Sequence, residues 1–276
     1  MRIRPSKIIS EAIILLCVFL MMVPIFWIVL MSLKSNIEIF NYPFLLPNPP
    51  KFQNYTAAWT RVNFLNLMKN TLTIAVFTII AGTIISIMSS FVIARFRFSA
   101  KIQNAFYVYF ISGIITPVFV LLFPVYIIIH KMGLHGTYWS IILPYLGWCA
   151  PMNTLILVGA MRNVPTALEE AAALDGCGML RILFNVFVPV LKPTIATIVL
   201  VQFLGIWNEF PLASVMINRP VNYTIALAVS FFKGMYTINY AHQTAAIMIV
   251  TIPQLIFFII FQRYVIEGIT AGALKG

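Results

Sequence analysis

The feature that most constrains this chain is a series of long apolar stretches, each of which can cross a membrane as a helix. The hydrocarbon core of a bilayer requires roughly 20 apolar residues of helix. The first such stretch covers about residues 12–33, behind a basic amino terminus. It ends at Lys34 without a small-residue cleavage site, so we interpret it as a membrane helix and not as a signal peptide.

Five further stretches have the same character. They cover residues 70–94, 102–129, 138–160, 193–216 and 241–261. Hydrophobic residues make up 61% of the chain and charged residues 9%, whereas soluble domains carry about 25% charged residues. Soluble enzymes, secreted modules and disordered chains are therefore excluded. The sequence predicts an all-α, polytopic membrane protein with six transmembrane helices.

The basic residues predict the orientation of these helices. With the amino terminus inside, eleven Lys and Arg fall in cytoplasmic segments and seven in outer segments, which favours cytoplasmic termini at both ends. The net charge of +11 therefore indicates topology, and no nucleic-acid partner is expected. The three cysteines and three histidines are scattered, so we predict no disulfide framework and no metal site.

One cytoplasmic segment, residues 163–192, is less membrane-like than the rest. A helix is expected at 165–175, with Asn163 as its cap and two early acids that favour the helix dipole. Gly176 and Gly178 should end it, and a second short helix at 179–188 should stop at Pro189. A shallow, acidic helix of this kind suits docking to another protein. An ordinary loop that caps its own bundle remains equally compatible with the composition.

The same segment resembles a known motif. Glu170-Ala171-Ala172, two further residues and Asp175-Gly176, followed by Phe184 and Pro189, are similar to the EAA motif of binding-protein-dependent ABC importer membrane subunits. Cys177 departs from it, since the family usually has Ala at that position.

The resemblance extends over essentially the entire chain. The final residues, 262–276, and the run Trp207-Asn208-Glu209-Phe210 are similar to carbohydrate-type permeases related to the shorter membrane subunit of the maltose transporter. This implies the type I ABC importer transmembrane fold in a bacterial cell membrane. It also implies three parts: the first helix and outer loop (1–65), the transmembrane domain (66–262) and a cytoplasmic tail (263–276).

Further implications of the resemblance concern the partners. A second, homologous permease subunit, two ATP-binding subunits and an extracytoplasmic sugar-binding protein are expected. The residues implied to contact the ATPase are Glu170, Ala171, Ala172, Asp175 and Gly176 in the motif, and Glu267, Gly268 and Gly272 in the tail. ATP and Mg²⁺ belong to the partner subunits, because this chain has no phosphate-binding loop and no catalytic arrangement, so it is not expected to be an enzyme.

The candidate substrate pathway is the run Trp207, Asn208 and Glu209. Glu209 is the one acid deep within a predicted span, and such residues usually face a cavity or a partner. An aromatic ring with adjacent polar groups suits a sugar, although a Trp at the membrane interface beside an acid at a helix end would give the same pattern. The alternatives for the whole chain are an ABC permease for a non-sugar solute and an ATP-independent carrier.

Overall fold

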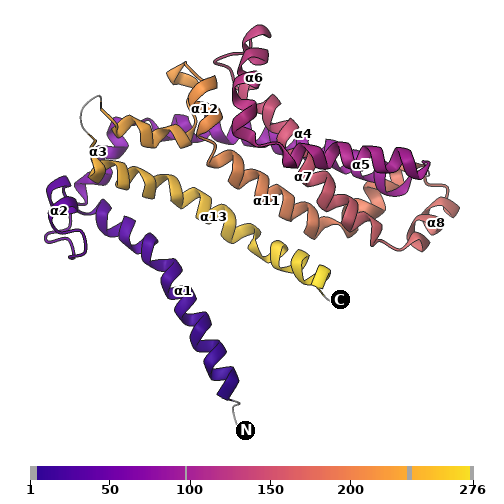
Figure 1. Cartoon of the computed structure of the whole chain (residues 1–276), viewed down its shortest axis with the longest axis horizontal. Helices are drawn as coiled ribbons and strands as arrows, with labels where there is room; N and C mark the ends of the chain where they lie inside the picture. Colours follow the sequence, from indigo (N-terminus) through magenta and orange to yellow (C-terminus); the bar gives the residue numbers. More distant parts are fainter. Residues whose placement is uncertain (1–4, 97, 235–237, 274–276) are drawn as a thin grey trace. The chain divides into compact units, whose positions relative to one another are not determined.

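A computed structural model of the protein describes residues 5–96, 98–234 and 238–273, with side chains for 10–96, 98–234 and 238–263 (Figure 1). The described part is helical apart from turns, loops and one isolated antiparallel bridge between Lys233 and Ile238. The long helices are α1 (Pro5–Ser32), α4 (Phe64–Arg95), α5 (Ala100–Ile115), α6 (Val118–Lys131), α7 (Trp139–Arg162), α11 (Lys192–Trp207) and α13 (Tyr240–Ala273). The shorter ones are α2 (Asn36–Asn41), α3 (Gln53–Arg61), α8 (Thr166–Leu174), α9 (Met179–Ile182), η1 (Leu183–Phe187), α10 (Val188–Val190), α12 (Pro211–Met216), η2 (Pro220–Asn222) and η3 (Ile225–Phe232).

The chain folds as two compact units. The first comprises the residues up to Phe64 together with Ala228–Pro253, and the second comprises Leu65–Leu227 with the residues from Gln254 onward. The first unit therefore holds α1, α2, α3 and the start of α13, whereas the second holds α4 to α12 and the rest of α13.

Four of the described helices are long and apolar enough to cross a bilayer, and the number rises to six if each of two bent helix pairs counts as one span. The four are Ser10–Ser32, Phe64–Arg95, Trp139–Arg162 and Tyr240–Arg263. They agree with the first, second, fourth and sixth predicted stretches. Five prolines lie inside helices, as membrane helices permit, namely Pro24, Pro124, Pro144, Pro151 and Pro253.

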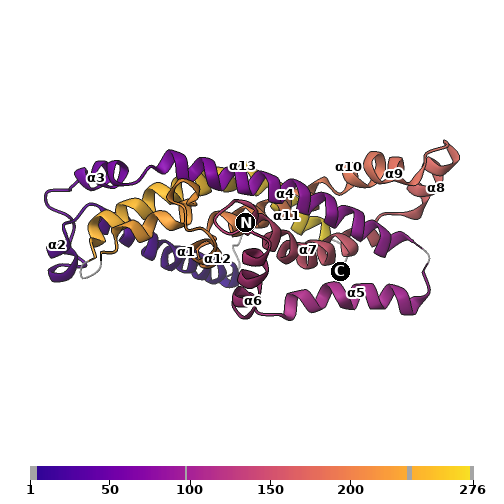
Figure 2. The ribbon, with the colours of Figure 1, turned by 90° about the horizontal axis from the view of Figure 1, so that it is seen from above.

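The run at 102–129, predicted as one span with Pro117 and Pro124 as candidate kinks, consists of two helices. These helices, α5 and α6, meet at a bend of 98° (Figure 2). The break falls at Thr116, whose backbone is extended, directly before Pro117. Proline disfavours the helical conformation in the residue that precedes it, and it has no N–H to continue the ladder.

The predicted span at 193–216 is also interrupted. Helix α11 ends at Trp207, and α12 starts at Pro211 after a break at residues 208–210. Proline suits the first turn of a helix, where its missing N–H is not needed, so Pro211 starts a new helix. At its other end α11 forms the second bent pair, with Met179–Val190, at 79°.

The segment after α1, which contains four prolines between residues 43 and 50, also contains two short helices. Ser35 begins α2 with a capping box, in which Ser35 Oγ accepts from the Glu38 N–H and the Glu38 carboxylate accepts from the Ser35 N–H. The proline-rich part between α2 and α3 has no helix. The capping box therefore starts a helix that ends before the first of these prolines, Pro43.

A buried apolar cluster in the second unit joins α4, α7, η1 and α11. Its fully enclosed members include Leu157 and Met161 of α7, Phe187 of η1 and Ile198 of α11. Helices α5 and α7 also pack tightly, since a Cβ added at Gly113 would lie 2.6 Å from Cγ of Pro151. This core supports the segment that carries the candidate site.

Candidate functional site

Helix α8 forms where the motif predicts a helix, but its amino-terminal cap differs from the prediction. Pro165 occupies the N-cap position without a side-chain hydrogen bond, and Asn163 instead ends α7 as its C-cap. The prediction that Asn163 caps α8 is therefore wrong. The reason is that α7 continues to Arg162, so Asn163 belongs to the end of the preceding helix.

The carboxyl end of α8 is a Schellman motif built on Gly176. The Gly176 N–H donates to Ala173 O and the Cys177 N–H donates to Ala172 O, both at 3.0 Å. Gly176 has a φ of 77°, which an L side chain rarely adopts. The predicted glycine stop is thus confirmed, and it turns the chain sharply into the next helix.

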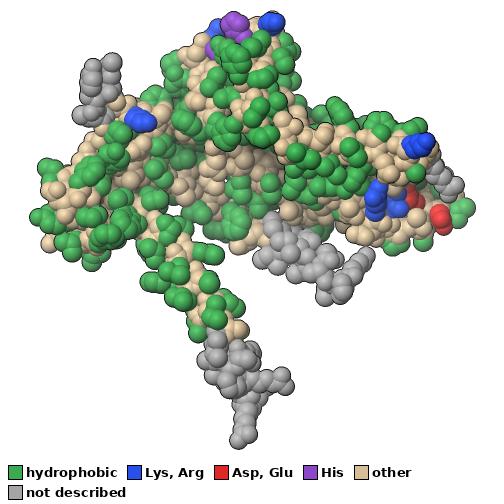
Figure 3. Space-filling model, viewed as in Figure 1, with side chains coloured by type: hydrophobic (Ala, Val, Ile, Leu, Met, Phe, Trp, Pro, Cys, Tyr) green, Lys and Arg blue, Asp and Glu red, His purple; other side chains and the backbone are tan. Residues whose placement is uncertain are grey.

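One side of α8 packs on the chain and the other is exposed. Ala172, half-buried, packs with Cys177 against the apolar cluster described above. The side chains of Glu170, Ala171 and Asp175 are exposed. Leu174 is 89% exposed, which is unusual for a large apolar residue in a charged environment. Figure 3 shows acidic and basic side chains gathered near α8. The exposed side therefore combines acids with small and apolar residues.

The helix that follows the glycine turn differs from the expected one at 179–188. Three pieces, α9, η1 and α10, run continuously past Pro189 to Val190. In the π-helical piece the Val188 N–H donates to Leu183 O, five residues back. Phe187 is thereby buried while Phe184 stays 47% exposed. The wide turn changes which side chains face the core.

Arg95, at the end of α4, connects α8 to the membrane helices. Its Nη2 donates to Met161 O at 2.7 Å and to Val164 O, at the end of α7. Its Nη1 lies 3.6 Å from Glu169 Oε2 of α8, and its guanidinium stands 5.0 Å from the ring centroid of Phe187. One side chain thus contacts α7, α8 and η1.

In the sequence, Arg95 counts only as one of the basic residues that predict the topology. A basic residue at the end of an apolar helix, with an acidic pair on the next segment predicted to be cytoplasmic, is a signal for such a contact. The signal does not specify a partner, because about 70 residues separate the two groups and several cations in the chain could pair with Glu169.

The tail residues Glu267, Gly268 and Gly272 lie in α13, which continues to Ala273. Their side chains lie outside the described residues. Glycine lowers helix stability by about 1 kcal/mol relative to alanine, so Gly268 and Gly272 weaken this end of α13. The backbone is nevertheless helical as far as the structure describes it.

The run Trp207, Asn208 and Glu209 lies at the break between α11 and α12. Trp207 is 1% exposed and packs on Phe203, with ring centroids 5.4 Å apart. Asn208 is exposed and its amide donates to Leu204 O. Glu209 is buried, and its Oε1 accepts from the Leu212 N–H at 2.6 Å, which caps α12.

The two candidate sites lie at opposite ends of α11. Its 16 residues correspond to about 24 Å, so α8 and the 207–209 run do not form one site. Between them, Gln202 Nε2 donates to Thr83 Oγ1 at 3.4 Å, and Asn153 is buried in α7. Among the described side chains, no three His, Cys, Asp or Glu are placed to hold a metal ion.

Comparison with known proteins agrees with this architecture. Residues 86–270 match the family described as binding-protein-dependent transport system inner membrane component. The diacetylchitobiose uptake system permease protein NgcG of Streptomyces coelicolor is 31% identical over 97% of this chain and 88% of its own length. The sulfoquinovosyl glycerol transport system permease protein SmoH of Agrobacterium fabrum is 29% identical over 92% of this chain and 88% of its own.

The fold has a close counterpart among solved structures. A chain in the crystal structure of a bacterial ABC transporter involved in the import of the acidic polysaccharide alginate superposes with a TM-score of 0.79. The two chains are 21% identical, and the match covers 96% of this chain and 99% of that one. The predicted all-α ABC importer transmembrane fold is therefore confirmed. By its family match and its relatives, this chain belongs to the family of binding-protein-dependent transport system inner membrane components.

Proposed function

We propose that this chain is the membrane-spanning permease subunit of an ABC importer that moves a sugar or oligosaccharide across the cytoplasmic membrane. Support for the sugar class comes from relatives named for diacetylchitobiose and sulfoquinovosyl glycerol, which align along nearly all of the chain. The chain is a transport subunit and not an enzyme. Separate ATP-binding subunits hydrolyse the ATP and hold its Mg²⁺.

The observation that carries the proposal is the exposed side of α8 together with its attachment through Arg95. Glu170, Ala171, Asp175 and Gly176 would fit a cleft in the ATPase, where Glu170 offers a carboxylate to a basic group. Ala172, which packs on the apolar cluster, would support this surface from within the chain. Because Arg95 bonds to the end of α7 and contacts Glu169, a displacement of α8 would be passed to α4 and α7. Such a coupling needs two arrangements of packed elements that the ATPase can bias.

The remaining assembly follows from the same proposal. A second permease subunit and an external sugar-binding protein complete the importer, with both termini of this chain in the cytoplasm. Residues 1–65 supply the first helix and outer loop, 66–262 the transmembrane domain and 263–276 the tail. In the tail, Glu267, Gly268 and Gly272 would extend α13 towards the ATPase pair.

Within the 207–209 run, exposure favours Asn208 as the residue that meets the substrate. Trp207 is enclosed by Phe203 and its neighbours, so its contribution would be to hold the pathway wall. Glu209 would position α12 through its bond to Leu212. Accordingly, Asn208→Ala should raise the apparent KM for the sugar several-fold without lowering the amount of assembled complex, whereas Trp207→Ala should lower that amount.

The experiment is ATP hydrolysis by the complex in proteoliposomes, stimulated by its sugar-loaded binding protein. Glu170→Ala and Gly176→Leu should abolish the stimulation while the complex still assembles. Gly178→Leu is the matched control, because Gly178 has a φ of −72° and open space around it. If both site variants remain stimulated, the coupling assignment fails. If no ATPase associates with the chain, an ATP-independent carrier becomes the better account. If a non-sugar solute stimulates ATP hydrolysis, the chain is an ABC permease for that solute.

A further inference from the structure

An exposed apolar loop follows the first membrane helix, in the first unit. Phe40, Phe44, Leu45 and Leu46 point outward within seven residues, and Phe44 and Leu46 are 76% and 75% exposed. Clusters of large apolar side chains on a surface usually mark an interaction with a partner or a membrane. This loop therefore requires a partner of apolar character.

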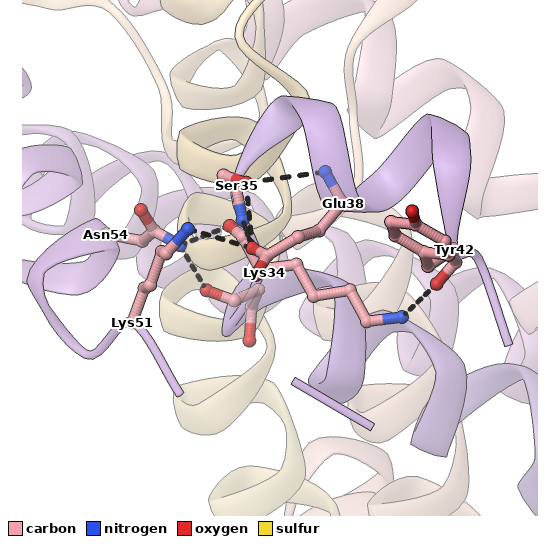
Figure 4. A network of polar contacts seen from close by, with 7 residues as sticks. Lys34, Ser35, Glu38, Tyr42, Lys51 and Asn54 are labelled. Carbon is pink, nitrogen blue, oxygen red and sulfur yellow. Dashed lines mark hydrogen bonds and ion pairs between the residues drawn. The ribbon is translucent and has the colours of Figure 1, made fainter. Parts of the chain in front are cut away.

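Polar contacts hold this loop against the carboxyl end of α1 (Figure 4). The ammonium of Lys34, which is 1% exposed, donates to Tyr42 O at 2.9 Å and to Pro43 O at 3.0 Å. The Lys51 N–H donates to Leu33 O at 2.8 Å, so the chain returns to the same point after the loop. The loop backbone is thus fixed next to the helix end and cannot extend far from it.

The loop also runs back along α1. The ring of Phe44 meets that of Trp27 edge to face, with centroids 4.6 Å apart. Trp27 precedes Ser32, the last residue of the helix, by five residues, which corresponds to about 7.5 Å along the helix axis. The span Ser10–Ser32 corresponds to about 34 Å, and a hydrocarbon core is about 30 Å thick. Phe44 therefore lies at the depth of the last turns of the apolar span.

A second span begins at the same level. In this unit the Ala241 N–H donates to Asn36 Oδ1 at 3.0 Å, and the rings of Phe40 and Tyr240 are 5.3 Å apart, edge to face. Tyr240 is the first residue of the span Tyr240–Arg263. Helix α2 thus lies beside the ends of two apolar helices, which is the position of a membrane interface.

We propose that the loop 40–46 inserts Phe44, Leu45 and Leu46 into the leaflet beside the end of α1, with lipid as its partner. Glu38 and Lys51 then lie at headgroup level, where charged groups remain solvated, and the buried ammonium of Lys34 is satisfied by Tyr42 O and Pro43 O. Lipid fits better than a protein because the ring of Phe44 packs back on Trp27 of α1, a helix that is apolar and exposed over most of its length, and does not extend past the end of that helix. The inference rests on the membrane placement in the proposed function.

The test measures the depth of single fluorescent labels in the complete complex in lipid vesicles. Cys17, Cys149 and Cys177 are first replaced by alanine, and a nitrobenzoxadiazole label is then attached to Phe44→Cys or Leu46→Cys. Phe19→Cys, in the middle of α1, is the lipid reference, and Arg219→Cys, in the exposed turn after α12, is the water reference. Nitroxide lipids quench labels in the bilayer, and iodide quenches labels in water.

We expect shallow nitroxide lipids to quench both loop labels at least twofold more strongly than the Arg219→Cys label, with little quenching by iodide. Quenching by iodide alone would place the loop in water and overturn the proposal. Protection from both quenchers would show that another protein chain covers the loop, which also overturns it. A Phe19→Cys label that nitroxide lipids fail to quench would contradict the membrane placement itself, so the two failures are distinguishable.

Discussion

The guanidinium of Arg95 lies 3.6 Å from the carboxylate of Glu169, and this pair joins the end of a membrane helix to the exposed helix α8. The same guanidinium donates to the last carbonyls of α7. Cations near a helix carboxyl terminus are favourable because the free carbonyls there carry partial negative charge. Arg95 therefore caps the carboxyl end of α7 and also positions α8.

Replacing Arg95 should separate these two roles. Arg95→Ala should destabilise the protein by about 3 kcal/mol, because hydrogen bonds to charged groups each contribute about 1.5–3 kcal/mol. Arg95→Lys keeps the charge but loses the planar fork, so it should retain part of the stability and lose much of the stimulated ATP hydrolysis. Thermal unfolding and proteoliposome ATP hydrolysis measure the two effects.

Glu169→Gln is the matched control for Arg95. The pair is long and partly exposed, so its loss should cost less than about 1 kcal/mol. A Glu169→Gln effect on stability as large as that of Arg95→Ala would show that the ion pair, and not the bonds to α7, carries the attachment.

Gly176→Ala should destabilise the end of α8. The left-handed conformation costs an L residue about 1–2 kcal/mol, and no atom lies within 4 Å to add a clash. Hydrogen exchange of the α8 amides should therefore accelerate by about 5–30-fold. In Gly178→Ala the φ of −72° is ordinary, so exchange should stay near that of the wild type. Equal acceleration in both variants would contradict the conformational explanation.

Gly113→Ala should disrupt the packing of α5 on α7. The added Cβ would lie 2.6 Å from the rigid ring of Pro151, and overpacking of this kind costs about 1–3 kcal/mol. Gly159→Ala in α7 meets nothing within 4 Å and should stabilise the helix by up to about 1 kcal/mol. Thermal midpoints that shift in the same direction for both variants would contradict the predicted contact.

The Glu38 carboxylate should make the stability of the loop that follows α1 depend on pH. Hydrogen bonds from the Ser35 N–H and the Lys51 ammonium lower the pKa of Glu38 from 4.5 to about 2. Because the folded pKa is the lower one, the stabilisation is complete above pH 4.5 and is lost as the pH falls from about 4.5 to about 2. The thermal midpoint of wild type should exceed that of Glu38→Gln at pH 6, and the difference should shrink by pH 3.

Lys51→Met provides the check on the cause of this shift. This substitution removes one of the two main donors to Glu38. The pH dependence of its thermal midpoint should therefore lie between those of wild type and Glu38→Gln. A difference between wild type and Glu38→Gln that stays constant from pH 6 to pH 3 would contradict the lowered pKa.

Local signals in the sequence predicted much of this protein. Runs of about 20 apolar residues located α1, α4, α7 and the first part of α13, because the thickness of a bilayer sets their length. Gly176 marked the end of α8, because the left-handed turn there is a property of that residue alone. The motif around Glu170 pointed to the family, and the family comparison confirmed it.

Tertiary structure decided what depends on groups far apart in the chain. The sequence did not show whether Pro117 and Pro211 interrupt a helix, because other prolines, such as Pro124 and Pro144, lie inside continuous helices. The contacts of Arg95 with Glu169 and with the end of α7 depend on how the helices pack. The same holds for the contact between the rings of Phe44 and Trp27. Composition and spacing thus determined which segments form helices and that these helices lie in a membrane. Packing decided which side chains meet, because a contact energy depends on distance in space and not on separation along the chain.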